Sequence, residues 1–211
     1  MPGSDWDYFM ENFFGDSYMM WHDGINPAAA RYLKGEERDK AEEMLIQSMK
    51  DGSYWAPMGL REMRSQAAVP VMKEFLVRVG GRSTIEIAHA LNVIEKTTEF
   101  IPYILGVLKN AGFWSDRMDA ARLLRNYDTL EVIEALYDSI SDADYLVRNH
   151  TCESLLQIHG LPESISTHKE IFQEITVDYD SNDEASITNA KEHYRRAAQM
   201  LSELIRKETA K

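Results

Sequence analysis

The chain has 211 residues and a formal net charge of −12, because 35 aspartates and glutamates outnumber 23 lysines and arginines. Binding to nucleic acid depends on cationic side chains that displace counterions from phosphate, so this charge disfavours a nucleic-acid partner. The apolar fraction of 44% is ordinary for a folded protein, and no apolar run approaches the length of about 18 residues that a membrane span needs. The lone cysteine, Cys152, and the lack of a signal-peptide pattern favour a cytoplasmic location.

The first predicted element is an aromatic N-terminal cap at residues 1–25. Seven aromatic and four acidic residues fall within the first 22 positions, which contain no lysine or arginine. The terminal units of repeat arrays must cover an otherwise open core, and this favours a cap. The same aromatic residues would suit an interface if they were exposed, and the sequence leaves that alternative open.

Helical periodicity then continues through residues 26–176. Turn-forming residues, such as Gly80-Gly81, divide this stretch into predicted helical hairpins at 26–51, 54–79, 83–110, 114–141 and 145–176. A ladder of leucines recurs at intervals of 31, 32 and 32 residues, and its members are Leu60, Leu91, Leu123 and Leu155. A period of this length is typical of stacked helical repeats.

The last predicted element is a long helix at 181–208, which caps the C-terminal end. Ser181 and Glu184 have the spacing of a capping box, and apolar residues such as Tyr194 and Leu201 follow on one face. Taken together, these elements predict an all-α fold with residues 1–211 in a single domain. We expect a right-handed α-solenoid of about five hairpins with capping helices at both ends.

Residues 114–160 carry a more specific pattern, in which an acidic turn precedes Val147-Arg148 and a leucine-rich stretch ends near Gly160. This pattern resembles HEAT-like repeats, in the short form of about 31 residues found in phycobilisome-lyase-type repeat proteins. The resemblance implies that the aspartates and arginines of successive repeats form a structural ladder. Its expected members are Asp116, Arg117, Asp142, Asp144 and Arg148.

Motifs for catalysis are absent from the sequence, so we expect no enzyme activity, no cofactor and no metal site. Glu86 and His89 form a single Glu-x-x-His pair, whereas carboxylate-bridged di-iron bundles use two such pairs and two further glutamates. Cys152 falls one period after Ala121, where a repeat needs a small packed residue, so we interpret it as a buried thiol.

The candidate binding residues are acidic and lie on the second helices of the last two hairpins, which line the concave face in HEAT-like arrays. Glu131, Glu134 and Asp138 follow i, i+3, i+7, and Glu170 and Glu174 follow i, i+4, so each set lies on one helix face. We therefore predict a non-enzymatic protein-binding module for a basic partner, with an inhibitor or immunity-type protein as one form of it. One alternative is that these acidic faces are simply solvated. Another is that the protein is a HEAT-like enzyme or enzyme subunit, with lyase-like or DNA base-excision activity.

Overall fold

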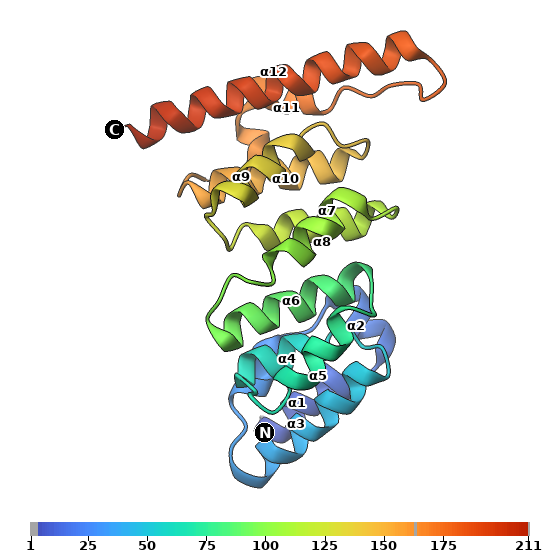
Figure 1. Ribbon diagram of the computed structural model, residues 1–211, viewed down its shortest axis with the longest axis vertical. Helices are drawn as coiled ribbons and strands as arrows, with labels where there is room; N and C mark the ends of the chain where they lie inside the picture. Colours follow the sequence, from blue (N-terminus) through green and yellow to red (C-terminus); the bar gives the residue numbers. More distant parts are fainter. Residues whose placement is uncertain (1–3, 163, 211) are drawn as a thin grey trace. The chain divides into compact units, whose positions relative to one another are not determined.

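The computed structural model describes residues 4–162 and 164–210, and every regular element in this part of the chain is helical (Figure 1). This confirms the predicted all-α class. The helices group into two compact units, Met1–Ile104 and Leu105–Lys211. Across the same described residues, no helix is both long enough and apolar enough to cross a membrane.

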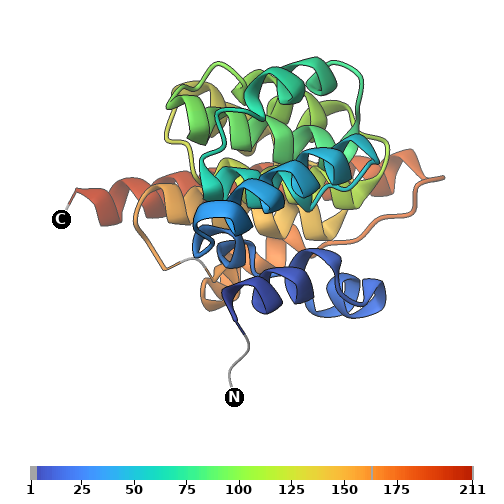
Figure 2. The same cartoon turned by 90° about the horizontal axis from the view of Figure 1, so that it is seen from below.

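The N-terminal unit is a sequential series of packed helices. Its elements are α1 (Asp5–Phe14), α2 (Ser17–Asp23), the 3-10 helix η1 (Pro27–Arg31), α3 (Gly35–Lys50), α4 (Ala56–Met63), α5 (Val69–Leu76), α6 (Gly81–Glu95) and the first residues of α7 (Ile101–Asn110). α1 packs on η1, η1 and α3 pack on α4, and both α4 and α5 pack on α6. As a result, α1 and α2 lie on one side of this unit and α5 and α6 lie on the other (Figure 2).

Close packing in the N-terminal unit depends on a glycine within α4. A Cβ atom on Gly59 would lie 2.8 Å from both Leu45 Cδ1 of α3 and Phe13 Cζ of α1. Phe13 and its neighbour Phe9 are buried, so α1 covers the core as the cap prediction requires. Glycine is therefore the residue that lets three helices meet at this point.

The C-terminal unit continues from the second half of α7. Its elements are α8 (Trp114–Leu124), α9 (Leu130–Ser139), α10 (Tyr145–Ile158), the 3-10 helix η2 (Ile165–Thr167), α11 (Lys169–Ile175) and α12 (Glu184–Thr209). α8 and α9 both pack on α10, α10 contacts α11, and α11 packs along α12. α10 therefore lies at the centre of this unit, with seven buried residues among its 14.

Four of the five predicted hairpins each hold two α-helices, with α6 beginning two residues before the predicted start, and the first hairpin differs. Residues 26–51 contain η1 and α3, so a short 3-10 helix replaces the expected first α-helix. Asn26 caps η1 by accepting from the Ala28 amide at 3.1 Å, and Gly35, with φ of 54°, begins α3 only four residues after η1 ends. The chain has no room for a longer helix there. Stacking of all five pairs into one solenoid domain stays a prediction.

The leucine ladder needs one correction, at its third position. Leu60, Leu91 and Leu155 are fully buried, but Leu123 is only half-buried and the buried residue is Leu124. Leu124 and Leu155 are 31 residues apart, which is also the interval between Leu60 and Leu91. The period is thus 31 within each of these pairs, and two additional residues fall between Leu91 and Leu124, which are 33 residues apart.

The start of the last helix also differs from the prediction. The residue that caps α12 is Asp183, whose Oδ1 accepts from the Ala185 amide at 2.9 Å, so the predicted Ser181–Glu184 capping box is wrong. Asp183 immediately precedes the helix, where a short carboxylate both caps amides and interacts favourably with the helix dipole. The predicted apolar face is confirmed, because Tyr194 and Leu201 are buried.

Candidate partner-binding site

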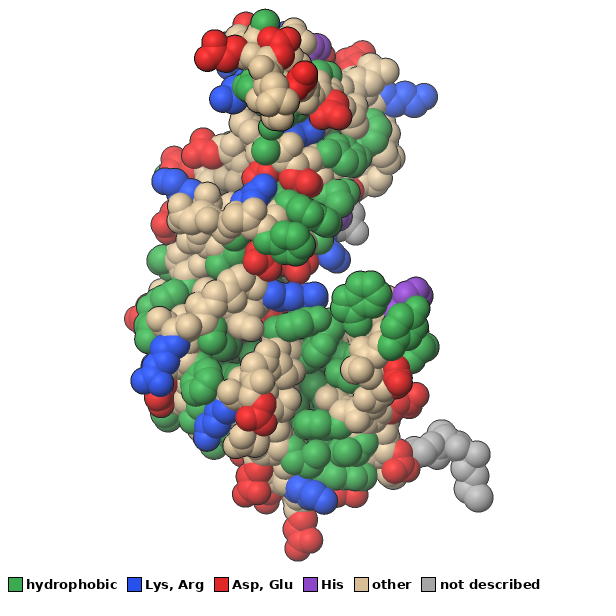
Figure 3. Space-filling view, turned by 90° about the vertical axis from the view of Figure 1, so that its right-hand side faces the viewer, with side chains coloured by type: hydrophobic (Ala, Val, Ile, Leu, Met, Phe, Trp, Pro, Cys, Tyr) green, Lys and Arg blue, Asp and Glu red, His purple; other side chains and the backbone are tan. Residues whose placement is uncertain are grey.

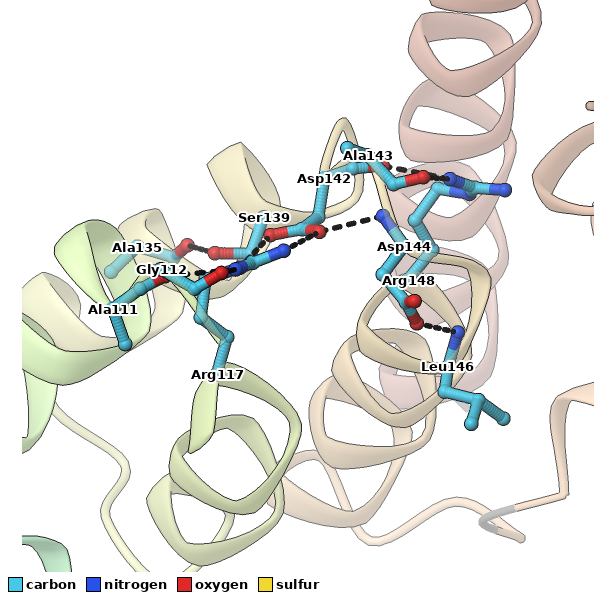
Figure 4. Close-up of polar contacts among 10 residues, drawn as sticks. All are labelled: Ala111, Gly112, Arg117, Ala135, Ser139, Asp142, Ala143, Asp144, Leu146 and Arg148. Atoms are coloured by element: carbon cyan, nitrogen blue, oxygen red, sulfur yellow. Dashed lines mark hydrogen bonds and ion pairs between the residues drawn. The ribbon is translucent and has the colours of Figure 1, made fainter. Parts of the chain in front are cut away.

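Two arginines of the C-terminal unit make the same contact 31 residues apart (Figure 4). Each donates through Nη1 to the two carbonyls that lie six and five residues before it, in the turn that precedes its own helix. The distances are 2.8 Å (Ala111 O) and 3.4 Å (Gly112 O) for Arg117, and 2.7 Å (Asp142 O) and 2.9 Å (Ala143 O) for Arg148. The repeat in sequence is therefore also a repeat in side-chain chemistry.

Asp142 connects the two copies of this contact. Its carboxylate accepts from Arg117 Nε at 2.7 Å and from Arg117 Nη2 at 2.9 Å, a bidentate geometry that adds strength and fixes orientation. The hydrogen bond with Asp142 is the main factor that raises the pKa of Arg117. Asp142 also accepts from the Asp144 amide at 2.8 Å, and Asp144 caps α10 by accepting from the Leu146 amide (Figure 4).

Arg148 is the most enclosed member of the expected ladder, with 2% of its surface exposed. Its Nε donates to Ile175 O at 2.9 Å, and its guanidinium lies 4.2 Å from the ring centroid of Tyr194. Arg148 thereby joins α10 to the end of α11 and to α12. Asp116 is placed in the first turn of α8, where a carboxylate favours the helix dipole. Both arginines thus donate to partners inside the unit.

The predicted acidic stripe of α9 lines a groove between α7 and α9, which we call the acidic groove. Glu131, Glu134 and Asp138 are all exposed, and all three line this groove of about 440 Å³. Across from them, α7 contributes Leu105, Leu108 and Lys109. The three carboxylates thus form one wall of the groove, and α7 forms an apolar wall with one lysine.

The residues of α7 in the acidic groove were not singled out from the sequence. Leu108 is 97% buried, but Leu105 is only half-buried and faces the groove with Lys109. The repeat period contained a usable signal: α7 and α9 are second helices of successive hairpins, so residues about 31 positions apart are expected to lie near each other.

The second predicted acidic pair separates in the structure. Glu174 Oε2 accepts from Arg196 Nε of α12 at 3.0 Å and lies 2.9 Å from His193 Nδ1, so its charge is matched within the unit. Glu170 instead lines a different hollow between α11 and α12, beside Lys169 and Lys207. These two glutamates do not form one unmatched acidic face, and the acidic groove of α9 is the stronger candidate.

Two side chains of types that can carry chemistry, His89 and Cys152, have pKa values shifted mainly by burial. Burial, and then the charge of Arg61, lower the pKa of His89 to about 3, so its ring is neutral near pH 7. Cys152 is fully buried, as interpreted from its position in the repeat, and burial raises the pKa of its thiol to about 12. Within residues 4–162 and 164–210, no three His, Cys, Asp or Glu side chains are grouped to hold a metal ion.

The aromatic N-terminal segment divides into a buried part and an exposed part. Phe9 and Phe13 of α1 are buried, whereas Tyr18 and Trp21 of α2 are 63% and 71% exposed. The buried and the exposed aromatic residues of this segment therefore lie on different helices.

Comparison of the chain with protein-family models, with curated proteins and with solved structures found no match.

Proposed function

We propose that this protein is a HEAT-like repeat protein that binds another protein, and that its acidic groove holds a lysine- or arginine-bearing segment of that partner. The observation that carries the proposal is the position of Glu131, Glu134 and Asp138, which are exposed and line one groove with an apolar wall. A solvated acidic face requires no such wall. A basic side chain has both a charged head and an apolar stem, and it suits this combination.

The charges of the acidic groove support a cationic occupant. Glu131, Glu134 and Asp138 face a single ammonium group, that of Lys109, while Asp142 at the groove edge is already matched by the guanidinium of Arg117. Each exposed ion pair formed with a partner would contribute about 0.2–1 kcal/mol, so the three carboxylates together would direct orientation and association rate more than affinity. The apolar wall of α7 would supply the remaining binding free energy.

Charge alone does not distinguish the acidic groove, because α3 carries an acidic stripe with the same spacing. Glu36, Asp39 and Glu43 also follow i, i+3, i+7 and are also exposed. The hollow beside α3 that Met44, Gln47 and Ser48 line does not include these three carboxylates. The α3 stripe is therefore a control with the same number of carboxylates at the same helical spacing, outside that hollow.

The proposed architecture behind this site is a right-handed α-solenoid built from short HEAT-like repeats. Support comes from the equivalent arginine contacts at 31-residue spacing and from the packing of α8 on α10, which are first helices of successive hairpins. In the N-terminal unit, α4 and α6 pack in the same way. Each hairpin would bury its apolar face against the next one along the chain.

Titration with a defined basic peptide tests the proposal. The probe is an acetylated, amidated peptide of alternating lysine and leucine, and the control probe has glutamate in place of lysine. We expect the lysine peptide to shift backbone amide resonances of residues 105–142, with little change in α3, and to lose affinity as salt is raised. Lys109→Glu should tighten binding severalfold, because it removes the one opposing charge. Shifts spread evenly over both acidic stripes would contradict the proposal.

A further inference from the structure

We infer that the partner segment which the acidic groove holds is a basic amphipathic helix. It lies along α9, with its basic side chains toward α9 and its apolar side chains toward α7. The inference rests on the proposed function and makes it more specific, because it names the conformation of the partner. It is carried by the spacing of the groove carboxylates, by the apolar wall across from them and by the backbone of both walls.

The carboxylates of the acidic groove form a single row along α9. Glu131, Glu134 and Asp138 follow i, i+3, i+7, all three are exposed, and all three line the groove. With a rise of about 1.5 Å per residue, the row extends about 10.5 Å along the helix axis, in steps of about 4.5 and about 6 Å. A partner that meets all three must therefore present three cations in a line at similar steps.

A helix is the partner conformation that matches this row. Side chains at i, i+3 or i+4, and i+7 of a helix lie on one face and repeat the same steps, so three basic side chains can each meet one carboxylate. Along an extended segment, side chains on one side recur at about 6.6 Å, so only two of them fall within the about 10.5 Å of the row. An extended segment would leave one carboxylate unmatched.

The apolar wall places a second requirement on the partner. Leu105 and Leu108 are three residues apart, so they share one face of α7, and both line the groove across from the carboxylates. A helix with an apolar stripe beside its basic stripe meets both walls at once. On the face of the C-terminal unit that Figure 3 shows, acidic and hydrophobic side chains likewise lie next to one another at the surface.

The backbone of the groove walls disfavours an extended occupant. Both walls belong to α-helices, whose N–H and C=O groups are hydrogen-bonded within the helix, so the groove offers no sheet edge on which a strand could pair. A polyproline-type segment docks between aromatic rings, and of the described residues that line the groove none is aromatic. A helix instead brings its own backbone hydrogen bonds with it.

The test compares two peptides that differ only in the chirality of two residues. Each is acetylated, amidated and about 14 residues long, with lysines in a helical i, i+3, i+7 stripe and leucines in the stripe beside it. In the second peptide two central lysines are D-lysine, which opposes the right-handed helix and leaves charge and composition unchanged. Both are measured below the concentration at which either self-associates.

We expect the all-L peptide to bind at least about ten-fold more tightly than its diastereomer at low salt. The Cα resonances of the carbon-13-labelled all-L peptide should move toward helical values on binding. Leu105→Ala should weaken its binding by about three- to ten-fold. Leu130→Ala is the control, because it removes a leucine of α9 that is 71% exposed and is not among the residues lining the groove, and it should leave the affinity unchanged.

The triple variant Glu131→Lys, Glu134→Lys, Asp138→Lys distinguishes failure of this inference from failure of the proposed function. If the wild type binds both peptides equally and the variant weakens both, the groove takes basic segments without selecting a helix, and only the inference is overturned. If the wild type binds neither peptide at low salt, the proposed function fails as well. A concentration-dependent dimer of the wild type that the variant loses would assign the groove to a second copy and also overturn the inference.

Discussion

Replacement of Arg148 by alanine should strongly destabilise the C-terminal unit. The side chain is 2% exposed, and its guanidinium donates to three backbone carbonyls, those of Asp142, Ala143 and Ile175, at 2.7–2.9 Å. It also lies over the ring of Tyr194. Arg148 therefore ties the turn before α10 to the end of α11 and to α12, and no other side chain described in this unit makes the same set of contacts.

The expected loss follows from these contacts. A hydrogen bond from a charged donor contributes about 1.5–3 kcal/mol, and the carbonyls left behind would lose their partner in a mostly buried place. Because such terms are not additive, we expect Arg148→Ala to lower the free energy of unfolding by about 4 kcal/mol. Arg148→Lys keeps the charge but not the fork, and should lose about 2 kcal/mol. The Arg122 side chain is 53% exposed, and its ion pair with Asp119 is long, at 4.0 Å. Arg122→Ala should therefore lower the free energy of unfolding by less than about 1 kcal/mol.

Urea unfolding provides the assay. Trp114 is the only tryptophan between Leu105 and Lys211, so fluorescence of a variant with the other three tryptophans replaced by phenylalanine reports on this unit. With a slope of about 2 kcal/mol per molar urea, a loss of about 4 kcal/mol lowers the midpoint by about 2 M. If Arg148→Ala shifts the midpoint no further than Arg122→Ala does, the arginine contacts do not stabilise the repeat and this reasoning is wrong.

Other predictions concern glycine and histidine. Gly59→Ala should destabilise the protein by about 1–3 kcal/mol, because the new Cβ would lie within 3 Å of Leu45 and Phe13. Gly106→Ala has open space around it and should stabilise α7 by about 0.5–1 kcal/mol. Thermal unfolding of the two variants compares these effects. The pKa of His89 is lowered from 6.5 to about 3 in the folded protein, so between these values the unfolded chain takes up a proton that the folded chain does not. The stability that depends on a neutral His89 is therefore fully present above pH 6.5 and is lost as the pH falls toward 3. Between pH 7 and pH 4.5 the wild type should lose about 2 kcal/mol more than His89→Gln in chemical unfolding, and parallel losses would contradict the burial of His89.

The fold class and most helix pairs could be predicted because apolar periodicity and turn residues are local signals. The burial of Leu124 in place of Leu123 could not be predicted, since two extra residues between Leu91 and Leu124 change the register and both leucines fit an apolar pattern. Asp183 replaced Ser181 as the cap for a similar reason: several residues before α12 can cap, and the chain path selects one.

The candidate site was predictable only in part. The spacing of Glu131, Glu134 and Asp138 places them on one face of a helix, but the groove depends on α7, a separate segment. Glu174 looked equivalent in the sequence, yet its carboxylate meets Arg196 of α12, a long-range contact that no local pattern contains. Exposure of the α2 aromatics was likewise undecided, because aromatic residues suit both a core and an interface.

The most direct test of the proposed function compares two triple charge reversals. One variant carries lysine at Glu131, Glu134 and Asp138, and the other carries lysine at Glu36, Asp39 and Glu43, so both change the net charge equally on exposed helix faces. Calorimetry with the lysine–leucine peptide at low salt gives the dissociation constant of each. We predict at least about ten-fold weaker binding for the acidic-groove variant and less than about two-fold for the α3 variant. Equal weakening in both would show that net charge, and not the acidic groove, attracts the peptide.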